Sequence, residues 1–186
     1  IPIKIGRNLD REDGRRRYVF MLGLIWDELR MNAATLRQIK ANYSFRLLLD
    51  SITSFDELVR MLYSKINVAS SQLEFLSTSS LLSIQSSGAV MEFDSDILYD
   101  KVRWAYENLT NFKSALTLAA ENLKLKVDLL DNQLKDLSEQ EEILLKRNIE
   151  NTLNSCLYEL SFCQEKTGQA VASIEKKLNK FGVKTD

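Results

Sequence analysis

The 186-residue sequence has no histidine, a single proline (Pro2), six glycines and two cysteines. Without histidine, the chain cannot carry out Ser-His or Cys-His nucleophilic catalysis, use imidazole as an acid or base, or form a histidine-containing metal site. Proline and glycine usually make up about 5% and about 7% of a protein, so little in this chain interrupts regular secondary structure. The composition therefore predicts a helical protein and excludes most familiar enzyme classes.

The two cysteines, Cys156 and Cys163, lie seven residues apart. On one helix this spacing separates their Cα atoms by roughly 10 Å, at about 1.5 Å of rise per residue, which is too far for a disulfide. We expect two buried free thiols that pack as small apolar residues in a reducing compartment. No apolar run approaches the roughly 18 residues of a membrane span, and no signal peptide is visible.

The chain carries 25 Lys and Arg against 26 Asp and Glu, but the positive charge is concentrated near the front. Residues 1–17 hold six basic and three acidic residues, a net charge of +3, whereas the remainder has a net charge of −4. Arg15, Arg16 and Arg17 stand directly before an apolar segment, as basic residues do on the cytoplasmic side of membranes. We therefore expect them to contact anionic lipid headgroups, with a solvated charge run as the alternative. Nucleic acid is a weaker candidate, because its binders normally carry a clear basic excess.

A heptad seam follows the triple arginine and predicts one long helix over 15–42. Its positions alternate in steps of four and three: Tyr18, Leu22, Ile25, Leu29, Asn32, Leu36, Ile39 and Tyr43. Asn32 is the one polar residue on this seam. We expect it to be buried and hydrogen-bonded to backbone of 67–93, in a structural role.

The two ends of this first segment have different patterns. Residues 1–14 predict a basic extended arm that turns at Asp13-Gly14 before the helix. The first half of the helix is apolar nearly all round, so we expect it to be covered on several sides. The apolar residues off the seam are Val19, Phe20, Met21 and Leu24.

Residues 44–93 are less regular but contain two helix signals. Ser54-Phe-Asp-Glu57 is a capping box and predicts a helix over 54–66. The serine-rich stretch from Ser77 to Gly88 predicts a short capped helix over 78–87, closed by Gly88 in the left-handed conformation.

The last half predicts a long antiparallel helical hairpin over 94–182. Asp94 is placed as an N-cap, and a seam runs from Leu98 to Leu137. Ser138-Glu-Gln-Glu141 is a second capping box, so we expect the chain to turn there. A second seam then runs to Phe181 and ends at Gly182.

The acidic clusters are the remaining candidates for acid or base chemistry. They are Asp94/Asp96/Asp100 and Glu139/Glu141/Glu142, and both stand at predicted helix N-termini. Negative charge is favourable there, so helix capping explains both clusters. We predict no catalytic residue, no cofactor and no metal site.

Three further motifs follow the triple arginine. They are Asp27-Glu28-Leu29-x-x-Asn32-x-x-x-Leu36, a segment from Leu76-Ser-Thr-Ser-Ser-Leu to Gly88-Ala-Val90, and Tyr106-x-x-Leu109. Together they resemble a little-characterised set of prokaryotic helical domains that show EL..N...L, then LST..W..L..SGAL, then L...Y..L. The resemblance covers about residues 15–115, and Leu81 stands where that family generally has Trp. It implies a module that follows an N-terminal membrane helix, without implying a reaction.

These patterns together predict an all-α fold: one elongated helical bundle over 1–186 with a long antiparallel coiled-coil-like hairpin. Its parts are a basic arm (1–14), N-terminal helices (15–93) and the hairpin (94–182). We expect a non-catalytic interaction or sensory module on the cytoplasmic face of a membrane protein, tethered by a segment upstream of residue 1. A homo-oligomeric coiled-coil scaffold is the alternative, and a small-molecule binding domain is a weaker one. Apolar residues off the seams predict self-association, or a partner helix, through the tip half of the hairpin.

Overall fold

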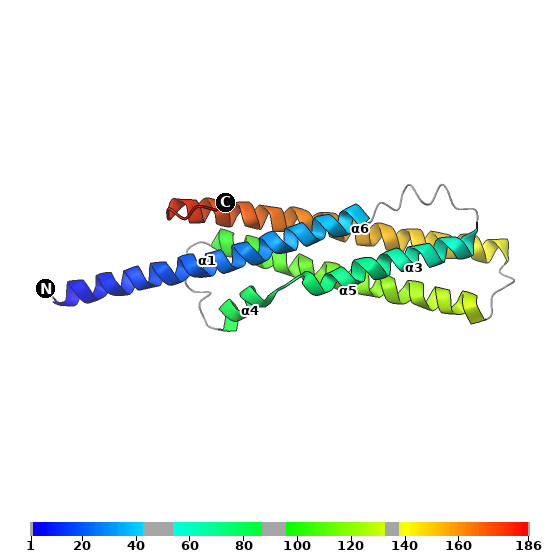
Figure 1. The fold of residues 1–186 in the computed structure, drawn as a ribbon, viewed down its shortest axis with the longest axis horizontal. Helices are drawn as coiled ribbons and strands as arrows, with labels where there is room; N and C mark the ends of the chain where they lie inside the picture. Colours follow the sequence, from blue (N-terminus) through cyan, green and yellow to red (C-terminus); the bar gives the residue numbers. More distant parts are fainter. Residues whose placement is uncertain (1, 43–53, 87–95, 133–137, 186) are drawn as a thin grey trace. The chain divides into compact units, whose positions relative to one another are not determined.

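The computed structural model describes residues 2–42, 54–86, 96–132 and 138–185 (Figure 1). The helices in this part of the chain are α1 (Pro2–Asn42), α3 (Phe55–Ser71), α4 (Ser79–Ser86), α5 (Asp96–Asn132) and α6 (Glu139–Lys180). A short 3-10 helix, η1 (Gln72–Phe75), follows α3, and none of the described elements is a strand. The predicted all-α class, with long helices packed as a bundle, is confirmed.

Helix α1 begins at Pro2, so the extended arm expected for 1–14 is wrong. Proline suits a first helical turn because its φ is preset and its missing N–H is not needed there. Gly14 lies inside α1 instead of in a turn, at a cost of about 1 kcal/mol relative to alanine. The helix continues through it, and Arg16 Nη2 lies 3.6 Å from Glu12 Oε1 one turn earlier.

The chain folds into two compact units, each built from several separate stretches of sequence. Unit 1 comprises Ile1–Ala33, Ser77–Glu107 and Glu165–Asp186, and unit 2 comprises Ala34–Leu76 and Asn108–Gln164. Helices α1, α5 and α6 therefore contribute residues to both units. The interpretation of 1–186 as one domain stays a prediction.

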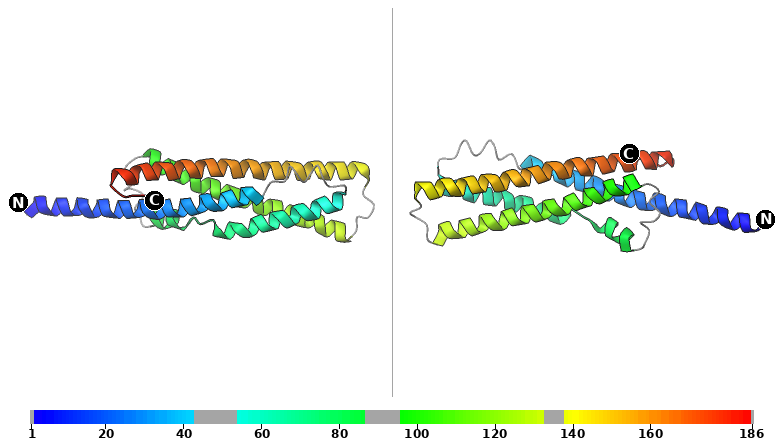
Figure 2. Two further views of the ribbon diagram at one scale, coloured as in Figure 1. Left: turned by 45° about the horizontal axis from the view of Figure 1, so that its top comes forward. Right: turned by 180° about the vertical axis from the view of Figure 1, so that it is seen from behind.

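Unit 1 is held together by the first seam residues of α1 packed against α5 and α6. Its core residues are Tyr18, Leu22, Ile25, Leu29, Leu81, Leu98, Val102, Ala105, Ala170, Ile174 and Leu178, all buried. In this unit the start of α5 runs beside the end of α6 (Figure 2). Lys101 Nζ donates to Ser173 Oγ at 3.1 Å across that pair, as an antiparallel hairpin requires.

Unit 2 has its own core, to which α3 contributes one complete face. The buried α3 residues are Leu58, Val59, Leu62, Ile66 and Ala69, spaced as an amphipathic helix requires. Cys156 Sγ lies 3.4 Å from the Ala115 carbonyl oxygen, which pairs α5 and α6 antiparallel here too. Both cysteines are buried and free, as expected, and burial, followed by the charge of Glu159, raises the pKa of the Cys156 thiol to about 11.

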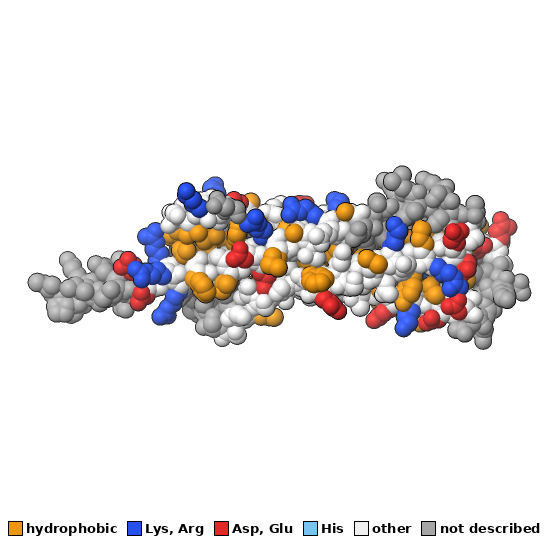
Figure 3. Space-filling view, viewed as in Figure 1, with side chains coloured by type: hydrophobic (Ala, Val, Ile, Leu, Met, Phe, Trp, Pro, Cys, Tyr) orange, Lys and Arg blue, Asp and Glu red, His pale blue; other side chains and the backbone are white. Residues whose placement is uncertain are grey.

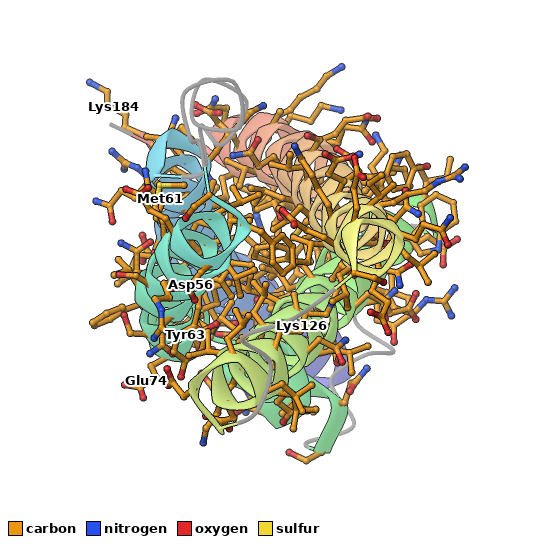
Figure 4. The ribbon with its side chains drawn as sticks, turned by 90° about the vertical axis from the view of Figure 1, so that its right-hand side faces the viewer. Asp56, Met61, Tyr63, Glu74, Lys126 and Lys184 are labelled. Carbon is orange, nitrogen blue, oxygen red and sulfur yellow. The ribbon has the colours of Figure 1, made fainter. Side chains whose placement is uncertain are left out.

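Charged residues of unit 2 lie mainly at the margins of this core. Arg60 on α3 donates to Asp56 Oδ1 at 3.0 Å and to Asp131 Oδ1 at 2.6 Å, which ties α3 to α5. Figure 4 shows Asp56 on α3, and Lys126 on α5 close to the side chains packed between the helices. Burial lowers the pKa of Lys126.

The helix ends follow the capping signals in the sequence. Glu57 N donates to Ser54 Oγ at 3.2 Å where α3 begins. At the start of α6 the capping box is reciprocal, because Glu141 N donates to Ser138 Oγ at 3.4 Å and Ser138 N donates to Glu141 Oε2 at 3.0 Å. Gly88 and Asp94, expected to cap other helices, lie outside the described residues.

Helix α6 ends in a Schellman motif at Gly182, which has a φ of +80°. The Gly182 amide donates to the Asn179 carbonyl at 3.0 Å, and the Val183 amide donates to the Leu178 carbonyl at 3.2 Å. Side chains with a Cβ disfavour this left-handed conformation, so glycine is required here for its backbone.

Two glycine substitutions on α6 are expected to change stability in opposite directions. Gly182→Ala should lower the free energy of unfolding by about 1 kcal/mol, because alanine is strained at positive φ. Gly168→Ala should raise it by up to about 1 kcal/mol, because Gly168 is exposed inside the helix and a Cβ there meets no atom within 4 Å. Urea unfolding followed by far-UV circular dichroism measures both, and equal effects would contradict the Schellman assignment.

Candidate functional site

Asn32 lies in unit 1 and is fully buried on the α1 seam. Its amide contacts both backbone groups of one residue: Asn32 Nδ2 donates to the Ser77 carbonyl at 2.7 Å, and Ser77 N donates to Asn32 Oδ1 at 2.9 Å. The structure thus places Asn32 against the backbone of the 67–93 region, as expected. One side chain thus satisfies a donor and an acceptor of half-buried, non-helical backbone.

Glu28 lies one turn before Asn32 on the same face of α1 and is only 9% exposed. Its Oε2 accepts hydrogen bonds from Ser77 Oγ at 2.7 Å, Ser79 Oγ at 2.8 Å, Ser80 N at 3.1 Å and Ser80 Oγ at 3.2 Å. Its Oε1 accepts from Tyr106 Oη at 2.7 Å and also from Ser80 N at 3.3 Å. We call Glu28, Asn32, Ser77, Ser79, Ser80 and Tyr106 the polar lock.

The polar lock stabilises an anion without a cation, because no ion pair in the described part of the chain involves Glu28. Burial raises the pKa of Glu28, but hydrogen bonds from Tyr106, Ser77, Ser79 and Ser80 outweigh it and leave the pKa below its ordinary value. Burial first, and then the hydrogen bond to Glu28 and its charge, raise the pKa of the Tyr106 hydroxyl. Near neutral pH the pair is therefore an ionised carboxylate and a neutral phenol.

The polar lock also caps the N-terminus of α4 with a side chain from another helix, Glu28 of α1. Ser80 N belongs to the first turn of α4, and the carboxylate that it meets comes from α1. A negative charge at the positive end of the α4 macrodipole is favourable. The internal donors already engage both carboxylate oxygens, so we assign Glu28 a structural role in docking α4 onto α1 and α5.

Sequence reasoning singled out Asn32 but not Glu28, Ser79, Ser80 or Tyr106. The signal was present in the three motifs that follow the triple arginine, because each contributes part of the lock. The sequence could not show that the three motifs form one hydrogen-bond network. Heptad spacing does not indicate which loop packs against a polar seam residue.

Asn32→Leu is expected to lower the free energy of unfolding by about 2–4 kcal/mol, because both backbone groups of Ser77 lose their partner. Urea denaturation measures the change. Asn111→Leu, at an exposed position on α5, is the matched control and should shift it by less than about 0.5 kcal/mol. Similar losses in the two variants would mean that added hydrophobicity, and not the lock, is responsible.

Glu28→Gln is expected to destabilise the protein by about 1.5–3 kcal/mol at pH 7, because charge-assisted hydrogen bonds become neutral ones. The folded-state pKa of Glu28 lies below the ordinary carboxyl value of 4.5, so its contribution is complete above that value and is lost as the pH falls below it. The gap between wild type and Glu28→Gln should therefore narrow below about pH 4.5. Thermal melts from pH 3.5 to 7.5 test this, with Glu121→Gln, exposed on α5, as control.

Arg15, Arg16 and Arg17 are exposed on α1, and the structure brings Lys177 of α6 close to Arg15. The Arg15 guanidinium lies 5.1 Å from the centre of the Phe181 ring, and Lys177 Nζ lies 5.9 Å from the same centre. Tyr18 and Phe181 meet edge to face with ring centres 5.9 Å apart. Two cations from different helices therefore share one aromatic ring. We call Arg15, Arg16, Arg17, Lys176, Lys177 and Lys180 the basic cluster.

An exposed apolar stripe on α1 starts one turn after Arg16 of the basic cluster. Arg16, Phe20 and Leu24 follow one another at intervals of four residues, and Phe20 is 67% exposed and Leu24 44%. The expectation that this end of the helix is covered on several sides is therefore wrong: the seam faces the core of unit 1, and the opposite face stays open. Figure 3 shows basic side chains gathered beside hydrophobic ones on this part of the surface.

The remaining predicted features have simpler roles. Glu139, Glu141 and Glu142 occupy the first turn of α6, where capping was expected. In the described ranges, no group of carboxylates and thiols is arranged to hold a metal ion. None of the helices that the structure describes has both the length and the apolar character to cross a membrane.

Comparison of the chain with protein-family models, curated proteins and solved structures gives no match. The resemblance to prokaryotic helical domains therefore stays a prediction.

Proposed function

We propose that this protein is a non-catalytic interaction module that docks on the anionic, cytoplasmic face of a membrane. The observation that carries the proposal is the apolar stripe of α1, which begins at the basic cluster and lies open to solvent. Juxtamembrane basic residues are each worth about 1 kcal/mol near an anionic bilayer surface. Apolar side chains in the same region add burial in the headgroup layer, as interfacial helices do.

The positive charges of the basic cluster come from α1 and α6. Contacts with the Phe181 ring hold Arg15 of α1 and Lys177 of α6 near each other. Arg15 and Lys177 share the Phe181 ring, and Lys177 Nζ also lies 5.8 Å from the Tyr18 ring. Glu12 offsets part of the charge of Arg16, at 3.6 Å. The excess is nonetheless positive, which supports attraction to anionic lipid and explains why the triple arginine need not act alone.

The protein is expected to bind vesicles that contain anionic lipid and to leave neutral phosphatidylcholine vesicles unbound. Arg15→Gln/Arg16→Gln/Arg17→Gln should weaken binding by about 100-fold, since three contacts of about 1 kcal/mol each are lost. Vesicle co-sedimentation at 0.1 M salt, on the order of physiological ionic strength, measures the partition coefficient.

The matched control is Lys124→Gln/Lys146→Gln/Arg147→Gln, which removes three exposed positive charges from unit 2. It has the same net charge as the first variant but keeps the basic cluster. Equal losses of binding in the two variants would show a response to net charge alone and contradict a docking surface. Binding to neutral vesicles that is insensitive to salt would contradict the electrostatic argument.

A homo-oligomeric scaffold is the second candidate, and an exposed apolar surface in unit 2 favours it. Leu125 and Leu129 on α5 and Ile143 and Leu144 on α6 are all more than half exposed. Helix α3 covers part of this half of the hairpin, which the sequence argument for self-association did not consider. The residues left open still form the kind of surface that buries itself against a second copy or a partner helix.

Under this second proposal, light scattering should give a mass twice the 21.4 kDa of one chain at high protein concentration. Leu125→Lys/Leu144→Lys should return the protein to a monomer, because a buried unpaired ammonium strongly disfavours the interface. Leu82→Lys, at an exposed apolar position of unit 1, serves as the control. A single 21.4 kDa species for the wild type counts against the dimer.

A further inference from the structure

A groove of about 500 Å³ lies in unit 1 between the start of α5 and the end of α6. Four of its seven lining residues are lysines, and none is acidic. The lining is Ile97, Leu98, Lys101, Ser173, Lys176, Lys177 and Lys180. Its α6 lysines belong to the basic cluster, so the groove extends that cluster onto α5.

Lys101 shows that the charge of the groove is more than a helix-end effect. Lysines in the last turn of α6 are favoured by its macrodipole, which accounts for Lys177 and Lys180. Lys101 comes from α5, and its ammonium donates to the neutral Ser173 hydroxyl at 3.1 Å. The Ser173 hydroxyl is in turn oriented by the Gln169 carbonyl at 2.7 Å, which fixes the acceptor that Lys101 uses.

The two described carboxylates closest to the groove, Asp100 and Glu175, make other contacts. Asp100 lies 3.7 Å from Arg103, and Glu175 accepts from the Thr185 hydroxyl at 3.2 Å. Among the described residues, Lys101, Lys176 and Lys180 take part in no ion pair. Three ammonium groups that form no ion pair within the described ranges favour a compact anion that carries more than one negative charge.

The groove also presents hydrocarbon to its occupant. Ile97 is 71% exposed at its rim, and Leu98 is buried beneath it. A ligand that satisfies both features has a multiply charged head and an apolar body. A phosphomonoester carries about −1.5 to −2 charges near neutral pH and offers strong acceptor oxygens, whereas a phosphodiester lacks the second ionisation.

We propose that this groove binds the phosphomonoester headgroup of an anionic lipid. Lys101, Lys176 and Lys180 contact the phosphate, and Ile97 packs against the adjoining glycerol and acyl carbons. This inference rests on the proposed membrane docking, because it names the lipid that the same basic surface selects.

The test compares phosphatidic acid vesicles, which carry a phosphomonoester, with phosphatidylglycerol vesicles adjusted to the same surface potential. Wild-type protein should bind phosphatidic acid at least about fivefold more tightly, the equivalent of one further charge contact. Lys101→Gln/Lys176→Gln/Lys180→Gln should remove this preference. Lys176→Gln/Lys180→Gln, which keeps the contact between Lys101 and Ser173, should reduce it and serves if the triple variant does not fold.

Two charge-matched variants separate the possible failures. Arg15→Gln/Arg16→Gln/Arg17→Gln should weaken binding to both lipids and keep the preference, and the unit 2 triple variant should keep both binding and preference. Equal affinity for the two lipids overturns the groove proposal while leaving membrane docking intact. Absence of binding to either vesicle overturns both proposals.

Calorimetry in solution distinguishes a lipid headgroup from a free phosphate ester. Dihexanoyl phosphatidic acid below its micelle concentration should bind more tightly than glycerol 3-phosphate, because Ile97 contacts the acylated part. Equal affinities for the two compounds overturn the lipid assignment.

Discussion

The ionised carboxylate of Glu28, buried without a cation, is the interaction on which unit 1 depends. Moving a carboxylate out of water is unfavourable unless hydrogen bonds replace its hydration. Here the replacement comes from Ser77, from the first turn of α4 and from Tyr106 of α5. These elements must assemble together for Glu28 to be satisfied, so the charge makes their arrangement cooperative.

The same helix serves the core and the proposed docking surface with opposite faces. The register that buries Leu22, Ile25 and Leu29 in unit 1 necessarily turns Arg16, Phe20 and Leu24 outward. The polar lock fixes α4 on α1, whereas burial of these apolar residues sets the register. The contacts that dock α4 and the proposed docking surface therefore involve different residues of α1.

The helices could be predicted because heptad spacing and caps act locally. Ser138 with Glu141, and Gly182 at the end of α6, each mark a boundary that backbone hydrogen bonding alone explains. Pro2 and Gly14 misled the prediction for residues 1–14, since both are tolerated in a helix when the surrounding turns form. Asn32 could be identified as buried, but its partner Ser77, 45 residues away, could not. Glu28 was named only as part of a motif, because the hydroxyl groups that bind it come from segments distant in the sequence.

The donors around Glu28 outnumber the lone pairs that they serve. Oε2 is approached by three serine hydroxyls and one amide, whereas a carboxylate oxygen offers about two lone-pair sites. Each hydroxyl can therefore substitute for another, and no individual serine is indispensable. Glu28 and Asn32, in contrast, each make hydrogen bonds that no other residue of the polar lock can replace. Loss of any one serine hydroxyl should therefore cost less stability than loss of the Glu28 carboxylate or the Asn32 amide.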